Sequence, residues 1–70
     1  MVTIFLIQDT ETKEYLSTYG TIGFRPSKLL ALSFMTKDIA IDELRYMENS
    51  NHKDLLANRF IDIKEYITFN

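Results

Sequence analysis

Nucleophilic catalysis is the first chemistry to look for, because it needs a nucleophile, a base that activates it and a group that orients the base. Serine and threonine hydroxyls are present, but His52 is the only imidazole in the 70 residues. His52 lies in the polar stretch SNHKD, which is typical of a solvated connection between elements. We therefore interpret His52 as a surface histidine and predict no catalytic residue.

Pairs of carboxylates could act as a general acid and a general base, and two pairs are close enough in sequence to consider. Glu11 and Glu14 lie in one polar stretch, while Asp38 and Asp42 fall one turn apart on a predicted helix. Arg45 follows on the same polar face of that helix. A solvated helix face explains this pattern without an active site, so we predict that the chain is not an enzyme.

Metal and phosphate sites find little support in the residue pattern. The chain has no cysteine, which excludes disulfides and thiolate metal ligands together. Residues 9–11 (DTE) supply oxygen atoms but lack the length and pattern of a calcium loop. Gly20 and Gly23 are not followed by a lysine at a helix start, as a phosphate-binding loop requires. We expect no metal and no cofactor.

Nucleic-acid binding is the chemistry that four other residues favour. Tyr15 and Tyr19 could stack on bases, and Arg25 and Lys28 could clamp the phosphates of a single strand. The formal net charge of −2 disfavours this partner, since a nucleic-acid surface is normally basic. A tyrosine pair that stabilises a sheet is the simpler interpretation. Binding of single-stranded or duplex nucleic acid is therefore our alternative function.

A predicted loop over residues 20–28 is the candidate surface for a protein partner. It holds both glycines, and its proline, Pro26, denies a sheet one amide donor. Ile22, Phe24 and Arg25 are its candidate contact residues, because loops on a rigid scaffold often carry function. In the alternative, Ile22 and Phe24 fold back to seal the core, since small domains need every apolar group they have.

The most clearly specified element is a helix over residues 36–49. Thr36 is a good N-cap, because its hydroxyl can accept a hydrogen bond from an amide of the first turn. Ala40, Leu44 and Met47 recur at helical spacing and predict the buried face. Residues 49–51 (NSN) are expected to end the helix, since asparagine tolerates the left-handed conformation.

Two further segments predict a β-hairpin. Residues 2–9 (VTIFLIQD) are nearly continuously apolar, which favours a central strand or one covered on both faces. Residues 9–13 are polar and typical of a turn. Residues 14–19 (EYLSTY) then read as the returning strand.

Residues 29–35 (LLALSFM) admit either a strand or a helix. As a helix they would fuse with the helix over residues 36–49. Thr36 argues against fusion, because a capping residue there implies a new helix start. We therefore predict a short third strand over these residues.

Residues 60–69 (FIDIKEYITF) admit the same two readings. A strand places alternate apolar residues on one face, namely Ile61, Ile63, Ile67 and Phe69. A helix would instead use the face of Leu56, Phe60, Ile63 and Ile67. The many β-branched and aromatic residues favour the strand.

Together these elements predict one α+β domain over residues 1–70, in which a small, mainly antiparallel sheet has one helix packed on one face. Its order is β-hairpin, short third strand, helix and C-terminal strand, and the last strand lies beside the first. Because a chain this small has neither disulfides nor a metal site, we expect it to gain stability as a homodimer. An exposed strand edge could pair with a partner.

The chain resembles small uncharacterised proteins encoded in phages and prophages of low-GC Gram-positive bacteria. Their shared pattern is a "Y-L … G" hairpin, an "A-x-x-F-x-T" strand and an "A-x-x-x-L" helix. The matching residues here are Tyr15, Leu16, Gly20, Ala31, Phe34, Thr36, Ala40 and Leu44. The pattern consists of core and capping residues, so the resemblance implies no active site. It implies a protein that binds and alters a host protein.

The leading expectation is thus a non-catalytic protein-interaction domain, in the role of a phage accessory protein that modulates a host or defence protein. Its start, MVTIFLIQD, lacks the basic flank and cleavage site of a signal peptide. No run approaches the ~20 apolar residues of a membrane helix. We therefore expect the bacterial host cytoplasm and no membrane partner.

Overall fold

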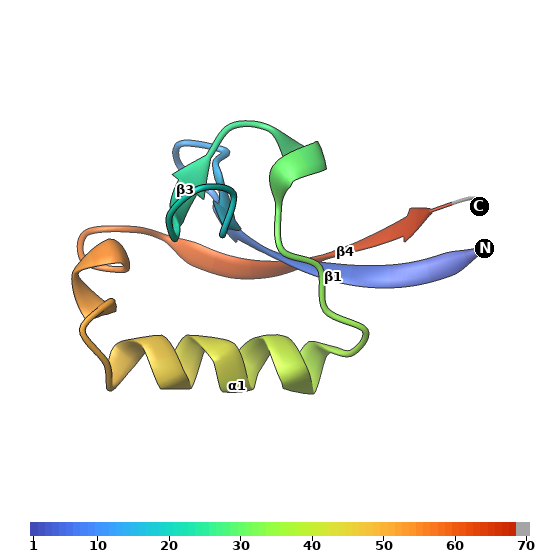
Figure 1. Cartoon of the computed structure of the whole chain (residues 1–70). Coiled ribbons are helices and arrows are strands. Elements are labelled where there is room, and N and C mark those ends of the chain that lie inside the picture. The colour runs from blue at the N-terminus through green and yellow to red at the C-terminus, as the bar shows by residue number, and fades with distance from the viewer. Residues whose placement is uncertain (69–70) are drawn as a thin grey trace.

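The computed structural model describes residues 1–68, which form a four-stranded antiparallel sheet and one α-helix (Figure 1). The strands lie in the order β3-β2-β1-β4. In chain order the elements are β1 (Val2–Asp9), β2 (Tyr15–Ser17), β3 (Gly23–Arg25), the 3₁₀ turn η1 (Lys28–Leu30), α1 (Lys37–Glu48), the 3₁₀ turn η2 (Lys53–Leu55) and β4 (Ile61–Thr68). The predicted α+β fold is confirmed.

Strand β1 is central in the sheet, as its continuous apolar run indicated. The last four residues of the strand, from Leu6 to Asp9, are all buried, so both of its faces are covered there. In Figure 1, α1 lies on one side of the β1–β4 ribbon, and the β2–β3 hairpin and η1 lie on the other. A strand with one face in water would instead show alternating burial.

The β1–β4 ladder is the longest pairing in the molecule. It runs from Val2 opposite Thr68 to Asp9 opposite Ile61. The strand interpretation of residues 60–69 is therefore confirmed over β4, and the helical alternative is wrong. The prediction for Phe69 lies outside the described residues. Ile61 and Ile63 pack against the core, whereas Ile67 is 54% exposed because it lies near the end of the ribbon.

Helix α1 begins and ends close to the predicted residues. The Thr36 hydroxyl accepts a hydrogen bond from the amide of Ile39 at 3.2 Å, which confirms the N-cap. The left-handed ending at Asn49 was wrong, since its φ is −107°. Asn49 instead ends the helix with its side chain, whose Nδ2 donates to the carbonyl of Arg45 at 2.9 Å. That bond satisfies one of the last free carbonyls.

The core lies between α1 and the sheet. Its fully buried members are Ile7, Leu16, Ala40 and Met47, and Leu44 packs against them. The predicted apolar face of the helix is therefore its buried face. Burial of a side chain such as Ile7 or Leu16 contributes about 2 kcal/mol, so a few residues supply most of the hydrophobic stabilisation.

The third strand lies at β3, inside the stretch predicted as a loop. Leu16 and Phe24 are direct partners in the β2–β3 ladder. The turn between them uses Gly20 at a φ of +79°, a conformation that side chains with a Cβ rarely adopt. Extending the hairpin by this third strand stabilises β2, which a two-stranded ribbon would leave marginal.

Residues 29–35 do not form the predicted strand. Lys28–Leu30 is the 3₁₀ turn η1, and Phe34 makes a single bridge with Phe5, with both bonds at 2.9 Å. The Leu32 amide donates to the carbonyl of Leu16 at 2.9 Å. Since β2 pairs with β1 only at Tyr15, Phe34 takes up backbone groups that β2 leaves free on β1, and Leu32 takes up a carbonyl of β2 itself.

Candidate interaction surface

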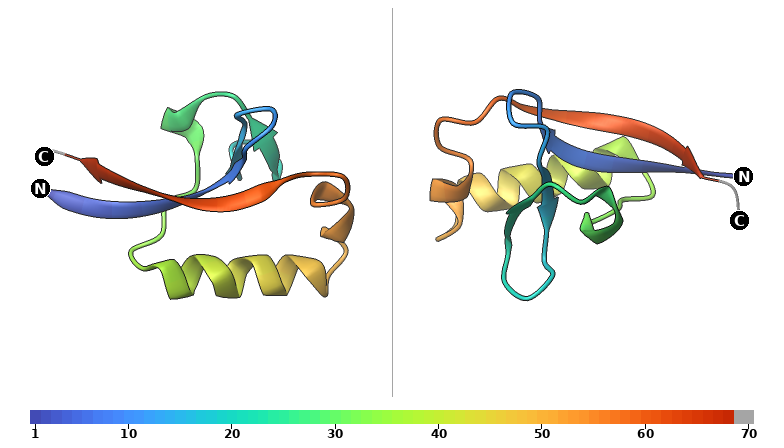
Figure 2. Two further views of the ribbon diagram at one scale, coloured as in Figure 1. Left: turned by 180° about the vertical axis from the view of Figure 1, so that it is seen from behind. Right: turned by 90° about the horizontal axis from the view of Figure 1, so that it is seen from above.

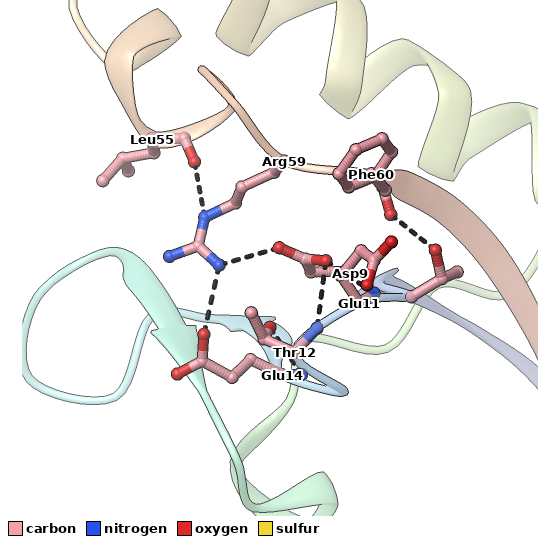
Figure 3. Close-up of polar contacts among 8 residues, drawn as sticks. Asp9, Glu11, Thr12, Glu14, Leu55, Arg59 and Phe60 are labelled. Carbon is pink, nitrogen blue, oxygen red and sulfur yellow. Dashed lines mark hydrogen bonds and ion pairs between the residues drawn. The ribbon is translucent and has the colours of Figure 1, made fainter.

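A charged cluster joins the first hairpin to the segment that precedes β4 (Figure 3). Arg59 is at its centre, and Nη1 donates to Asp9 Oδ2 and to Glu14 Oε1, both at 3.1 Å. The Arg59 Nε donates to the carbonyl of Leu55 at 3.0 Å, and the guanidinium lies 4.1 Å from the centre of the Phe24 ring. One side chain therefore contacts three separate parts of the chain.

Asp9 is the buried member of this cluster, with 2% of its surface exposed. Its Oδ1 accepts the amides of Glu11 at 2.9 Å and Thr12 at 3.3 Å, which closes the turn of the hairpin. Burial alone would raise the pKa of the Asp9 carboxyl. The two amides and the Arg59 guanidinium outweigh burial, so the pKa lies below its ordinary value.

This cluster fixes the place where β4 begins. The amide and hydroxyl of Thr10 both meet the carbonyl of Phe60, at 2.8 Å and 3.1 Å. Asn58, just before the cluster's arginine, has a φ of +61° and turns the chain into the strand. The cluster thus holds β4 in register at its first residues, and its polar groups are occupied in doing so.

Chemical sites of other kinds are not found in the part of the chain that the structure describes. Residues 1–68 enclose no pocket and contain no group of three histidines, cysteines or carboxylates that could hold a metal. Within the same range, every buried side-chain nitrogen and oxygen has a hydrogen-bond partner. His52 directly precedes η2 and is partly exposed.

The predicted protein-contact residues are mostly engaged within the chain. Ile22 and Phe24 pack against the core, as in the alternative interpretation. Arg25 binds backbone carbonyls through its guanidinium, with Nη2 donating to Tyr19 at 2.6 Å and to Thr21 at 2.8 Å. These contacts brace the turn between β2 and β3, and they leave Tyr19, which is 67% exposed, as the free side chain nearby.

The four residues of the nucleic-acid alternative are divided between two structural contacts. The Tyr15 hydroxyl lies 3.2 Å from that of Tyr66, their rings meet edge to face, and Lys28 Nζ is 3.8 Å from the centre of the Tyr66 ring. The hydrogen bond with Tyr66, then burial, raises the pKa of Tyr15. Arg25 contacts Tyr19 through its guanidinium, which donates to the Tyr19 carbonyl in the turn between β2 and β3. Nucleic-acid binding therefore stays a prediction, and a band shift of labelled DNA that weakens with salt would test it.

The sequence predicted an exposed strand edge without indicating which strand forms it. In the structure, the outer edge of β4 is such an edge. Phe5 exchanges both backbone bonds with Phe34, so its N–H and C=O point away from β4. Its partner Glu65 therefore points its own N–H and C=O outwards, by the alternation of an antiparallel ladder. The same holds for the other odd-numbered residues of the strand, Ile61, Ile63 and Ile67.

Within residues 1–68 no strand pairs with this edge, which is bordered by apolar and charged side chains. Phe60 is 62% exposed. Asp62 Oδ1 accepts the outward amide of Ile63 at 2.8 Å, and its Oδ2 lies 3.4 Å from Lys64 Nζ. The Ile63 amide, then Lys64, lowers the pKa of Asp62. A side chain thus covers one of the outward amides.

Among residues 1–68, no helix is both long and apolar enough to cross a bilayer. Comparisons of the chain with protein-family models, with curated proteins and with solved structures found no match. The resemblance to phage-encoded proteins therefore stays a prediction, and function has to be argued from the surface itself.

Proposed function

We propose that this chain is a non-catalytic protein-interaction domain that binds its partner by strand pairing along the outer edge of β4. The observation that carries the proposal is an eight-residue strand whose outward N–H and C=O groups are unpaired by any strand of the described chain. Exposed main-chain groups of this kind give affinity to any extended segment that lies beside them, and alternate side chains give specificity.

The other edge of the sheet supports the choice of β4. Strand β3 has three residues, and such short edge strands offer few groups to a partner. The turn that precedes β3 is also held in place, because the Arg25 guanidinium donates to two of its carbonyls. Of the two edges, β4 offers the longer template.

The resemblance to phage-encoded proteins favours a role for this domain as an accessory factor in the bacterial host cytoplasm. There it would modulate a host or defence protein by occupying an extended segment of that protein. This role needs no catalytic group, which agrees with a charged cluster whose side chains are occupied in holding β4.

Glu65→Pro and Glu65→Ala form a matched pair that tests the edge. The Glu65 amide points outwards, so proline there removes an edge donor without removing a bond of the β1–β4 ladder. Proline also keeps the preceding residue, Lys64, in the extended conformation that it already has. Alanine removes the same side chain but keeps the amide.

The two variants and the unaltered chain are used as baits in a lysate of a low-GC Gram-positive bacterium. We expect a protein that the unaltered chain and Glu65→Ala retain and that Glu65→Pro loses. Equal retention by all three baits would overturn the proposal, and so would retention by none.

A further inference from the structure

The charges along β4 are complementary to the same strand of a second copy in one register. We infer that two copies of this chain pair edge to edge through β4, antiparallel, with Ile63 of both copies on the two-fold axis. This inference rests on the proposed function and names a second copy as one partner of that edge.

Backbone geometry limits the registers that such a pair can adopt. A two-fold axis that makes two strands antiparallel in one sheet is perpendicular to the sheet, so each residue stays on its own face. The outward groups belong to the odd-numbered residues, among them Ile61, Ile63 and Glu65. Odd residues must therefore lie opposite odd residues and even residues opposite even ones.

Charge then selects among these registers. Centring the pair on Asp62, Lys64 or Glu65 places that residue opposite its own copy, and like charges directly opposite are destabilising. Centring it on Ile61 or Tyr66 brings no opposite charges together. Centring it on Ile63 places Asp62 opposite the partner's Lys64, and the symmetry repeats this pair.

The same register gives the exposed groups at the edge a partner. Asp62 and the partner's Lys64 form a non-hydrogen-bonded pair, where side chains across a ladder are closest. Phe60 comes opposite the partner's Tyr66, an aromatic cross-strand pair. In the single chain the Ile63 amide donates to Asp62. In the pair it donates to the carbonyl of the partner's Ile63, and the Asp62 carboxylate binds the partner's Lys64 instead.

The edge is also open to a strand of this length. Seen from above, β4 forms one border of the molecule and α1 lies on its β1 side (Figure 2, right). The helix of one copy therefore does not cover the line along which the other copy would pair. Because one strand buries little surface, we expect a weak dimer that forms at high protein concentration.

Single cysteines test the register, because the chain has none of its own. In this register the two Ile63 Cα atoms lie about 5.5 Å apart, within the range of a disulfide. The two Glu65 positions are offset by about 13 Å along the strands. Under mild oxidation we expect Ile63→Cys to give a covalent dimer and Glu65→Cys to give at least about tenfold less.

A charge exchange tests the pairing without a cross-link. Lys64→Asp places the new carboxylate opposite the partner's Asp62, and we expect dimerisation in sedimentation equilibrium to weaken about tenfold. The double variant Asp62→Lys with Lys64→Asp restores opposite charges and should return to within about threefold of the unaltered chain. Circular dichroism of each variant verifies folding.

A monomer at high micromolar concentration, or faster cross-linking at position 65 than at 63, would overturn the inference. Failure of the double variant to recover would do the same. None of these results touches the bait experiment, in which an edge-dependent partner can appear while self-pairing fails. Conversely, a dimer with the expected register and no captured protein would leave self-pairing standing and remove the host-directed role.

Discussion

Within residues 1–68, both edges of this sheet leave backbone N–H and C=O groups without a strand partner, and the chain protects the two edges in different ways. At β3 the edge is short, its Phe24 packs into the core, and Arg25 uses its guanidinium to bind the adjoining turn. At β4 the edge is long, and a single carboxylate, Asp62, covers one outward amide. One edge is therefore closed by contacts within the chain, and the other by a contact that a partner can replace.

Leu16→Ala should have the largest effect, because it removes the buried side chain that anchors the β3 side of the sheet. Leu16 is fully buried, and such a truncation costs about 3 kcal/mol, much of the stability of a domain this small. Urea unfolding measures the loss. Ile67→Ala, near the exposed end of β4, is the control and should cost less than about 1 kcal/mol. Similar losses for both would contradict the contrast between the two sides.

Arg59→Ala should have the next largest effect, since it leaves Asp9 buried without its cationic partner. We expect a loss of about 2 kcal/mol in the free energy of unfolding. The control is Lys64→Ala, which removes an ion pair between exposed groups and should cost about 0.5 kcal/mol or less. Equal losses would show that the Arg59 cluster does not hold the start of β4.

Acid should weaken the same cluster by a smaller amount, because it neutralises Asp9 without removing Arg59. The pKa of Asp9 is lower in the folded chain than the ordinary value of 3.8. The folded state therefore gains stability from the ionised group above that value and loses it as the pH falls towards the lower, folded pKa. Urea midpoints at pH 7 and pH 3 measure the loss, and Asp9→Asn should show less pH dependence.

Arg25→Ala should have the smallest effect, confined to the β3 edge. It removes the hydrogen bonds to the carbonyls of Tyr19 and Thr21, at a cost of about 1 kcal/mol. Amide hydrogen exchange should quicken in β2 and β3 and stay unchanged in β4. Faster exchange throughout the sheet would show that the two edges are not independent.

Local patterns predicted the elements that local interactions determine. Thr36 and the spacing of Ala40, Leu44 and Met47 specified α1, because capping and helical periodicity act within a few residues. The alternation in residues 60–69 predicted β4 for the same reason. The predicted left-handed ending at Asn49 failed because a side-chain bond, which a residue type alone does not specify, served instead.

Contacts between distant residues account for what the sequence did not reveal. Residues 23–25 form a strand because β2 pairs with them. Leu30 lies in a 3₁₀ turn, where the Ser17 hydroxyl donates to its carbonyl at 2.6 Å. The Arg59 cluster joins residues about fifty positions apart, so no local pattern marks it. The strand order is needed to identify β4 as an edge strand, and the sequence does not specify that order.

Hydrogen exchange along β4 at low and at high protein concentration tests the central claim most directly. The outward amides of Ile61 and Glu65 should become more protected as concentration rises, while the ladder-bonded amides of Lys64 and Tyr66 should not change. The protein is measured alone, without any other protein. If the exchange rates of the Ile61 and Glu65 amides are the same at both concentrations, like those of Lys64 and Tyr66, self-pairing at this edge is contradicted.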